Sequence, residues 1–595
     1  MTSQPFLNYF ALKSVKVGER DFLQHHQKVV LEYVKQNTDK RGLVVYHETG
    51  TGKSILSIAL AHSFILASEK YDIIILSPKS LKANYLDQIT KYNEIIKPLL
   101  NPEDLKETSE KDLETRFNFA SYNSSNLIDQ IAKIKNKSPI NLEHTIFIID
   151  EAHNWNNMII NGSVQSTKLY KEITNTKDIK LFFLSGTPIV NDPFEIVPMF
   201  NMIHPGGNLL PVDHTQFYQL YIDKDKKHVE NSKNLKCRLY GKISYFGSYN
   251  FEINITKPIH RKGFPIQNPL ILERVLMSDY QKSRYMIHYV KERATKSQPK
   301  KKGIFITKSN VIGTYMVKTR QLSNITYDGD LSDVDMALLC KNLKKHSAKY
   351  DKLLRNLKKY PDTLSMIHSF FVNDYGIKLL ENILKYKGYR VGVITGEVTS
   401  DEQKVILDKF NSDSNKNGKH IQILLLSSVG SEGINLSNIT NIHILEPFWN
   451  FSKIKQIIAR GIRYTGKKEK RVIQPYLYLA DIEDNKEGLE LTDPFLYRLS
   501  MEKAFLVNEF NMMMVESSID CWIHNTNNRL KCLMCLPTNK SLFIDKDNDN
   551  SNLCRDYNID VKEVVVKDSL YFKGTDGSYY TQSGEYLDRV SDPTK

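Results

Sequence analysis

Short apolar runs alternate with amphipathic stretches over the first 205 residues of the chain. Four runs of continuous apolar residues are typical of strands buried on both faces of a parallel sheet: residues 43–46, 73–76, 146–149 and 181–184. Helical patterns lie between these runs, which is the rhythm of a doubly wound α/β sheet. The pattern therefore predicts a first α/β lobe.

The same rhythm returns in the second half of the chain. The runs that predict its strands are residues 365–371, 389–394, 421–426 and 441–445. A middle segment of about 140 residues separates the two halves, and it contains a basic run at 296–303 and a lysine-rich helical stretch at 340–360. From about residue 506 onward the composition of the chain changes, with polar loops and a last stretch that is rich in Tyr and Gly. We expect an α/β protein with two doubly wound lobes, a mixed α+β middle insertion and a small C-terminal domain, bounded at 1–205, 206–345, 346–505 and 506–595.

Length and composition narrow the class of protein. A chain of 595 residues is too long for one core, and 41 % hydrophobic with 25 % charged residues is ordinary for a globular protein. No apolar run approaches the roughly 18 residues of a membrane helix, and the N-terminus lacks a secretory signal, so we expect no membrane partner. Six cysteines make no disulfide framework, which favours a reducing, cytoplasmic location. The net charge of +14 is consistent with a polyanion partner, and equally with solvated lysines.

The stretch "VVYHETGTGKS", residues 44–54, has the order strand, loop and helix that a phosphate-binding loop requires. The usual pattern would have glycine where this chain has His47. Gly50 and Gly52 let backbone N–H groups face phosphate, Lys53 can reach the β- and γ-phosphates, and the Ser54 hydroxyl can ligate Mg²⁺. The alternative is a glycine-rich turn that carries Lys-Ser by chance. The predicted nucleotide-binding residues of the loop are His47, Glu48, Thr49, Gly50, Thr51, Gly52, Lys53 and Ser54.

A second stretch, "IFIIDEAHN", places acidic side chains at the end of a predicted strand. At that edge of a parallel sheet Asp150 would lie beside the phosphate loop, where it can hold Mg²⁺. Glu151 can orient and deprotonate the attacking water, and His153 could couple the site to the polar turn "LSGTPIVND" at 184–192. Together the two stretches predict ATP and Mg²⁺ as substrate and cofactor.

A third candidate is a helical face in the second lobe. Gln456, Arg460 and Arg463 recur at i, i+4 and i+7, so they share one side of a helix. Two such arginines are commonly a solvated stripe. The alternative is an arginine finger, which is worth roughly 10³–10⁵ in rate and would couple hydrolysis to closure of the lobes.

In order and chemistry, these motifs resemble those of superfamily 2 helicases and translocases. Gln27 matches the adenine-reading glutamine of that superfamily, and further matches are 76–85, "DEAH" at 150–153, "SGTP" at 185–188, 394–411, "SEGINL" at 431–436 and "QIIARGIR" at 456–463. The closest resemblance is to poxvirus nucleoside triphosphate phosphohydrolase I and its relatives on cytoplasmic linear plasmids of yeasts. The His-Glu-Thr-Gly opening of the loop is that family's form, which explains the missing glycine.

The resemblance implies two RecA-like lobes and a DNA-stimulated ATPase that serves transcription of a cytoplasmic virus-like genome or plasmid. It implies DNA, contacted through its phosphates, and a cytoplasmic RNA polymerase as partners. Residues 76–85, 431–436 and Trp449 are then the expected nucleic-acid contacts. An early transcription factor subunit shares much of the same motif set, so a promoter-binding factor with ancillary ATPase activity is the alternative.

The cysteines near the C-terminus suggest one further site. Cys521, His524, Cys532 and Cys535 have a C-x₂-H-x₇-C-x₂-C spacing, which suits tetrahedral Zn²⁺. Buried reduced cysteines without metal are the more common explanation. Zinc is therefore an additional, weaker expectation.

Overall fold

The computed structural model of the chain contains two compact units. The first comprises described residues up to 247 together with those from 506 onward, and the second comprises described residues between 257 and 505. The structure describes residues 23–48, 50–67, 71–96, 117–135, 140–204, 206–207, 209–223, 228–247, 257–260, 264–294, 316–329, 334–428, 434–462, 471–483, 488–524, 532–535, 554–556, 561–566, 569–574, 579–580 and 586–587.

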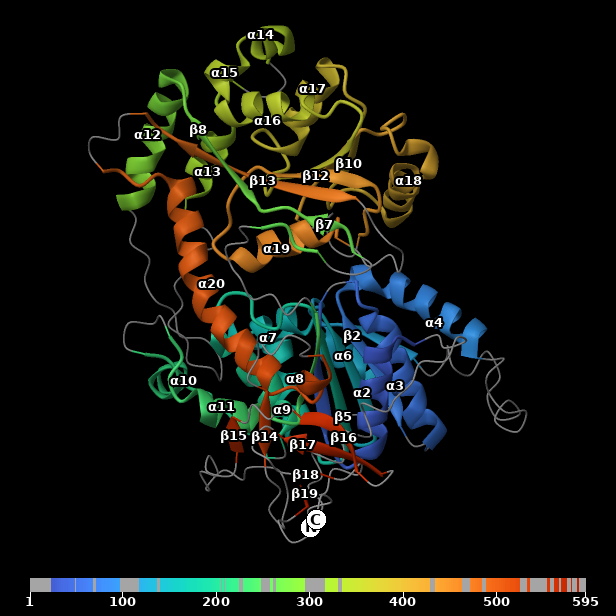
Figure 1. Cartoon of the computed structure of the whole chain (residues 1–595). Coiled ribbons are helices and arrows are strands. Elements are labelled where there is room, and N and C mark those ends of the chain that lie inside the picture. Colours follow the sequence, from blue (N-terminus) through green and yellow to red (C-terminus); the bar gives the residue numbers. More distant parts are fainter. Residues whose placement is uncertain are drawn as a thin grey trace. The chain divides into compact units, whose positions relative to one another are not determined.

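A six-stranded sheet with the order β3-β2-β4-β5-β1-β6 forms the centre of the first unit (Figure 1). Every neighbouring pair in it is parallel. Its strands are β1 (Gly42–His47), β2 (Asp72–Ser77), β3 (Phe117–Ser121), β4 (Thr145–Asp150), β5 (Ile179–Ser185) and β6 (Ile243–Phe246).

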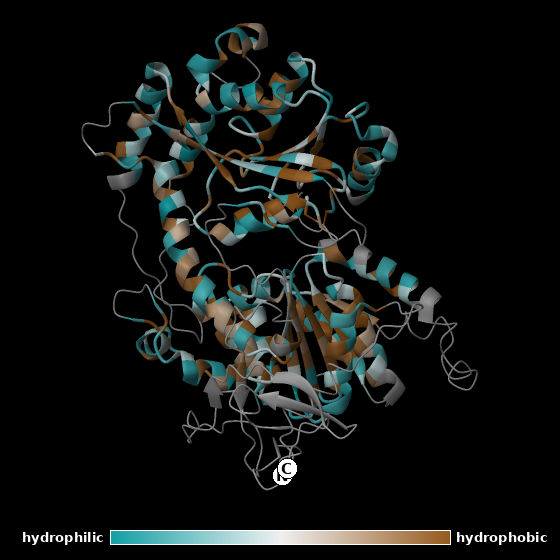
Figure 2. Cartoon of the chain, in the orientation of Figure 1, coloured by the Kyte–Doolittle hydropathy of each residue, from teal (hydrophilic) through white to brown (hydrophobic). Residues whose placement is uncertain are grey.

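Helices cover both faces of this sheet. Successive residues of a strand point to opposite sides, so each strand contributes side chains to two buried cores. Val44 and Phe147 belong to one buried core, whereas their neighbours Val45 and Ile148 belong to the other. Figure 2 shows the strands as the most hydrophobic part of the unit. The helices are α2 (His25–Gln36), α3 (Lys53–Ala67), α4 (Lys82–Ile96), α6 (Leu127–Lys135), α7 (Ala152–Ile160), α8 (Val164–Asn175), α9 (Val197–Ile203), α10 (His214–Tyr221), α11 (Ser232–Leu239), η1 (Lys79–Leu81) and η4 (Pro193–Ile196).

The second unit is built on a seven-stranded parallel sheet with the order β10-β11-β9-β12-β13-β7, in which β8 also pairs with β13. Two buried cores again lie on its opposite faces. The strands are β7 (Ile266–Gln267), β8 (Ile271–Leu276), β9 (Leu364–His368), β10 (Val391–Ile394), β11 (Ile423–Leu426), β12 (Ile439–Ile444) and β13 (Val472–Asp481).

The helices of the second unit include several from the segment that the sequence pattern assigned to a middle insertion. The division between the units falls within the long helix α20. The helices are α12 (Asp279–Ala294), α13 (Val317–Asn324), α14 (Met336–Lys341), α15 (Leu343–His346), α16 (Ala348–Lys358), α17 (Ile377–Tyr386), α18 (Ser400–Asn411), η6 (Asp413–Asn415), α19 (Phe451–Ala459) and α20 (Thr492–Glu516).

Short elements follow α20 in the C-terminal part. Helix α21 (Cys521–His524) precedes an antiparallel pair, β14 (Leu533–Cys535) with β15 (Cys554–Asp556). A four-stranded antiparallel sheet then consists of β16 (Val561–Val566), β17 (Ser569–Gly574), β18 (Tyr579–Tyr580) and β19 (Tyr586–Leu587).

The predicted fold class, α/β with two doubly wound RecA-like lobes, is confirmed by these two parallel sheets with helices on both faces. The four domain boundaries stay a prediction. Among the helices of the described ranges, none is both long and apolar enough to cross a bilayer.

Candidate active site

The phosphate loop joins the end of β1 to the start of α3 in the first unit. Gly50 and Gly52 have φ angles of 84° and 82°, a region that side chains rarely allow. A Cβ on Gly52 would also lie 2.5 Å from Gln27 Nε2. Lys53 Nζ donates to the backbone oxygens of His47 (3.0 Å) and Glu48 (3.3 Å), so the ammonium folds back over the loop. This is the geometry that a phosphate cradle requires. Thr49, which also belongs to the loop, lies outside the described residues.

His47, which stands where glycine is usual, points into the protein and is fully buried. Its Nε2 lies 2.8 Å from Ser244 Oγ. The ring of His26 packs edge-on against His47 and stacks on Phe246, with centroids 3.7 Å apart. Burial lowers the pKa of His26 to about 4, so this ring is neutral near pH 7. The missing glycine is therefore replaced by a packing residue of strand β1.

Gln27 holds the backbone of the loop. Its side-chain amide donates to the carbonyl oxygens of Thr51 (3.3 Å) and Gly52 (2.9 Å). Its Oε1 accepts from the backbone N–H of Gln24 at 2.8 Å. His26 Nε2 also lies 3.0 Å from the Thr51 oxygen. The N-terminus of α2 thus touches the nucleotide loop directly, and an adenine-selecting role for Gln27 stays a prediction.

The acidic motif begins where β4 ends, in the same unit. Asp150 is buried, and this burial, followed by the charge of Glu151, raises the pKa of the Asp150 carboxyl, which Lys53 counteracts. Glu151 has φ 47°, and its N–H donates to Asp150 Oδ1 at 2.9 Å. The N–H of Glu151 and the charge of its side chain thus both act on the Asp150 carboxyl.

His153 links the acidic motif to the next strand. Its Nδ1 lies 3.0 Å from Ser185 Oγ at the end of β5 and 3.6 Å from Glu151 Oε2. Ser185 Oγ also accepts from the N–H of Thr187 at 3.0 Å. The structure thus brings "DEAH" and "SGTP" together, which is the contact that the sequence pattern predicts.

Tyr85, on α4, is a site residue that sequence reasoning missed. Its hydroxyl lies 3.4 Å from Ser57 Oγ, and it hydrogen-bonds with the side chains of Asp150 and Ser54. The side chain is fully buried. Tyr85 is the last residue of the matched stretch 76–85, and this match was its only signal in the sequence. It connects the two residues predicted to ligate magnesium.

The residues present fit Mg²⁺. Ser54 and Asp150 supply the hard oxygen ligands that this ion prefers, and the buried Asp150 carboxylate would be stabilised by a nearby cation. Within the described residues no group of three or more His, Cys, Asp or Glu side chains could hold a metal. Mg²⁺ keeps water and substrate phosphates in its coordination sphere, so it needs few oxygen ligands from the protein.

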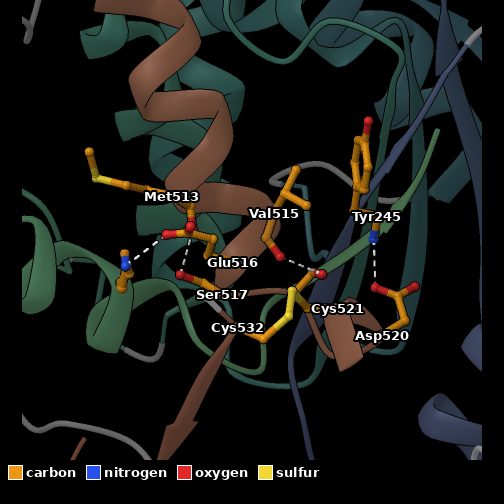
Figure 3. Close-up of a disulfide and its surroundings, with 10 residues drawn as sticks. Tyr245, Met513, Val515, Glu516, Ser517, Asp520, Cys521 and Cys532 are labelled. Atoms are coloured by element: carbon orange, nitrogen blue, oxygen red, sulfur yellow. Dashed lines mark hydrogen bonds and ion pairs between the residues drawn. A yellow bond between two sulfur atoms is a disulfide. The ribbon is translucent and has the colours of Figure 1, made fainter. Parts of the chain in front are cut away.

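A buried carboxylate anchors the strand beside the phosphate loop. Asp520, just before α21, accepts from Ser244 Oγ at 2.5 Å. It also accepts from the N–H of Tyr245 on β6 at 2.8 Å (Figure 3). The N–H of Ile519 donates to the Ile243 oxygen at 2.8 Å. Burial raises the pKa of Asp520 to about 6. Sequence reasoning missed this contact, which joins residues 276 positions apart.

The predicted zinc site is wrong. Cys521 and Cys532 form a disulfide (Figure 3), and disulfide sulfurs are not the thiolates that Zn²⁺ requires. The side chains of His524 and Cys535 lie outside the described residues. The spacing was informative in another sense: it identified two cysteines that the fold brings together.

In the second unit, Gln456 lies on α19 and Arg460 directly follows that helix. Burial lowers the pKa of His368, at the end of β9, to about 3, and the charges of Lys453 and Arg460 lower it further in the same direction. Arg463 and residues 431–433 of the "SEGINL" stretch lie outside the described residues. The catalytic role of the arginines stays a prediction.

A cavity of about 360 Å³ lies at the carboxyl ends of β2 and β3 in the first unit. Lys79 and Lys82 line it, and the ammonium of Lys82 lies 5.5 Å from the ring centroid of Phe119. The other residues of its lining are Ser77, Pro78, Ala120, Ser121, Asn123, Ser124 and Gln130, and most of the lining surface is apolar. The cavity falls on the stretch 76–85, the predicted nucleic-acid contact, and its cations and hydroxyls suit a phosphodiester.

Comparison with known proteins gives matches along most of the chain. The sequence profile of the SNF2-related domain matches residues 26–327, and that of the helicase conserved C-terminal domain matches residues 348–465. A protein of African swine fever virus named "Termination factor NPH-I homolog" is 31 % identical over 626 residues, covering 91 % of this chain and 84 % of the relative. The protein of that name from another isolate is 30 % identical, covering 93 % and 86 %.

A weaker match is the solved SWI2/SNF2 ATPase core of Sulfolobus solfataricus in complex with dsDNA. It is 18 % identical, covers 83 % of this chain and 95 % of that chain, and has a TM-score of 0.32. The sequence matches, rather than this one, confirm the resemblance predicted from the motifs.

Proposed function

This chain belongs to the SNF2-related family of helicase-type ATPases, and we propose from that premise that it is a DNA-dependent ATPase which moves along DNA during transcription. The observation that carries the proposal is the pairing, within one unit, of the phosphate loop at Lys53 with the carboxylates of Asp150 and Glu151. ATP and Mg²⁺ are its substrate and cofactor.

Each residue of the site has a distinct task in hydrolysis. The ammonium of Lys53 leaves the carbonyls of His47 and Glu48 and neutralises charge on the β- and γ-phosphates. Ser54 and Asp150 would hold Mg²⁺, which would supply positive charge that offsets the charge of the phosphates. Glu151 orients the attacking water and accepts its proton. His153 and Ser185 keep Glu151 in register with the end of β5.

We also propose that Arg460 and Arg463 supply positive charge to the γ-phosphate in the transition state. Helix α19 ends at Ala459, before both arginines, so the role is supported by the position of Arg460 directly after that helix and by the resemblance of "QIIARGIR" to the superfamily's motif, and not by a shared helical face. Gln456 is proposed to contact the nucleotide, and Gln27 to select adenine.

DNA is the proposed track of the motor. The net charge of +14 and the cavity lined by Lys79 and Lys82 support a polyanion partner. Contacts to phosphate carry no sequence information, so binding should be indifferent to sequence. The name of the viral relatives, a termination factor, supports transcription as the setting. The resemblance of the motifs suggests a cytoplasmic virus-like genome or plasmid, with an RNA polymerase as partner.

The rival proposal is a promoter-binding transcription factor subunit with ancillary ATPase activity. DNA binding by the isolated chain separates the two. The motor should bind strands of equal length and different sequence with similar affinity, and with a log–log salt slope of roughly −3 to −5 if about four to six phosphates are neutralised. A slope near zero, or strong preference for one sequence, would favour the promoter factor.

A further inference from the structure

The guanidinium of Arg320, on α13, is buried in the second unit, and two of its three nitrogens lack a hydrogen-bond acceptor among the described residues. The residue is 4 % exposed, and its Nε and Nη2 have no acceptor among the described residues. Burial lowers the pKa of Arg320, but an arginine stays charged in proteins. The charges of Glu446 and Asp493 act on Arg320 and offset part of the cost of its burial, but two guanidinium nitrogens still lack an acceptor, which needs an explanation.

Four aromatic rings surround this charge. The central carbon of the guanidinium lies 5.2 Å from the ring centroid of Phe371, 5.6 Å from Phe370, 5.7 Å from Trp449 and 5.9 Å from Phe448. Cation–π attraction to these rings offsets part of the desolvation. The rings come from two segments, after β9 and after β12, which are neighbouring strands of one sheet. Arg320 therefore joins two loops at the same edge.

Three of the rings form a continuous stack. Phe370 and Phe448 have centroids 4.5 Å apart with an interplanar angle of 18°, and Phe448 and Trp449 have centroids 3.7 Å apart at 27°. Phe370 and Phe448 pack against one of the cores of the unit, yet all the rings remain partly exposed. A half-exposed stack that ends in a tryptophan is an unusual way to fill a core, and a common way to bind a flat ligand.

A buried carboxylate fixes the segments that carry the rings. Glu446 is fully buried, and it accepts from Ser369 Oγ (2.7 Å), from the N–H of Phe370 (3.0 Å) and from the side chain of Asn324. Asn324 lies on α13, as Arg320 does. Helix α13 thus holds both ring-bearing segments, by hydrogen bonds through Glu446 and by the cation of Arg320.

The chemistry next to the stack is cationic. Helix α19 begins at Phe451, directly after the stack, and Asn450 Oδ1 caps it by accepting from the N–H of Lys453 at 2.9 Å. Lys453, Lys455 and then Arg460 follow on this segment. Aromatic faces beside cations are the combination that binds bases and phosphates of a nucleic acid at once.

We propose that the rings of Phe370, Phe448 and Trp449 are a stacking platform for nucleobases, and that Arg320 is the residue that positions it. The inference rests on the proposed function, because it names what the nucleic-acid site recognises in addition to phosphate. Arg320 touches the rings and not the ligand, so it is a positioning residue. In the alternative, the rings have only a structural role in the packing of the second unit, and loss of Arg320 changes only the free energy of unfolding.

The test compares a thymidine oligonucleotide with an abasic oligonucleotide of the same length, which has the same phosphates but no bases. Affinity is measured by fluorescence anisotropy with the full chain. The wild type should bind the base-bearing strand about tenfold or more tightly, because stacking on an aromatic side chain is worth about 1–3 kcal/mol per base. Trp449→Ala should remove most of this difference, and Arg320→Met should reduce it several-fold, while abasic affinity stays unchanged in both.

Lys318→Met is the matched control on the same helix. Its ammonium also lies over an aromatic ring, 4.2 Å from the centroid of Tyr375, and donates to the Tyr375 hydroxyl at 2.9 Å. It does not touch the stack, so it should retain the full preference for bases. Arg320→Lys keeps the charge without the planar group and should give an intermediate preference even if Arg320→Met fails to fold.

The outcomes separate the inference from the proposed function. Equal affinity of the wild type for both strands would overturn the platform and leave the ATPase proposal standing. A base preference that persists at full size in Arg320→Lys and Arg320→Met would remove Arg320 from the positioning role. Absence of binding to either strand would contradict the proposed function, and the platform with it. Quenching of tryptophan fluorescence by the base-bearing strand, lost in Trp449→Ala, is the expected spectroscopic signature.

Discussion

The imidazole of His47 lies 2.8 Å from the hydroxyl of Ser244, which in turn donates to the carboxylate of Asp520 at 2.5 Å. All three residues are fully buried. The position where phosphate loops commonly carry glycine is thus the first member of a buried chain of hydrogen bonds. Through it the nucleotide loop is connected to the C-terminal part of the first unit.

The Asp520 link predicts a pH-dependent stability. Because burial raises the pKa of Asp520 from 3.8 to about 6, the carboxyl stabilises the folded state most when protonated, and this contribution is lost as pH rises through about 6. Asp520→Asn mimics the protonated form at every pH. Its free energy of unfolding relative to wild type should therefore rise by about 3 kcal/mol between pH 4 and pH 7, measured by urea unfolding.

Asp87→Asn, which removes an exposed carboxylate paired with Lys91, is the control for that series. A constant difference between Asp520→Asn and wild type at all pH values would contradict the buried link. Asp520→Ala should be worse than Asp520→Asn throughout, since it leaves Ser244 and the Tyr245 N–H without their acceptor, at about 1–3 kcal/mol.

Lys53→Ala and Glu151→Gln should fail at different steps. Loss of the Lys53 ammonium should weaken ATP binding and reduce turnover by about 10²-fold or more, because it removes the main cation on the phosphates. Glu151→Gln should keep ATP affinity and stop turnover, since an amide cannot accept the water's proton. Nucleotide affinity and ATPase rate are measured together, with the exposed Lys91→Ala as control. Near-wild-type turnover in either site variant would end this assignment.

Arg460→Ala and Arg463→Ala should leave ATP binding intact while turnover falls about 10³-fold, roughly 4 kcal/mol of transition-state stabilisation. DNA should no longer stimulate these variants. Single-turnover hydrolysis at saturating DNA is the measurement, with Arg498→Ala as control, an exposed arginine that pairs with Glu490 and Glu502. A wild-type rate constant in either variant would remove that arginine from the catalytic set.

The Cys521–Cys532 disulfide predicts that the protein purified without reductant contains no stoichiometric zinc. Peptide mapping without reduction should recover the two cysteines in one cross-linked pair. Cys532→Ser should cost about 3 kcal/mol in stability under oxidising conditions, from the unfolded-chain entropy of a loop of 11 residues, and nothing under reducing conditions. One bound zinc per chain, or free thiols at both positions, would contradict the pairing.

The central strands of both sheets could be predicted from the sequence because they are buried on both faces. Runs such as "LVVY" and "IFII" have no polar face. Such a run is typical of a strand that is covered by helices on both sides. Strands β3 ("FNFAS") and β6 ("ISYF") lie at the two edges of the first sheet. Their runs mix polar and apolar residues, so the hydrophobic pattern did not predict them as strands. Strand β13 contains Pro475, which argues locally against a strand.

The candidate catalytic motifs could also be found in the sequence, because phosphate chemistry requires particular residues at fixed short spacings around Gly50, Lys53 and Asp150. The contacts that support these motifs could not be predicted from the sequence. Ser244 meets Asp520 across 276 positions, and Arg320 reaches Trp449 from a helix in the predicted middle insertion. Such contacts depend on tertiary packing and leave no periodic trace. The same limit explains why the cysteine spacing suggested zinc where the fold forms a disulfide.

The ATPase rate of the isolated chain, measured in parallel without nucleic acid and with single-stranded DNA, duplex DNA and RNA, tests the central claim most directly. Glu151→Gln provides the background for each condition. A DNA-dependent motor should be slow alone and should accelerate at least tenfold with DNA of any sequence, with little response to RNA. A rate that exceeds the Glu151→Gln background but is the same in all four conditions, or no hydrolysis above that background, would contradict it.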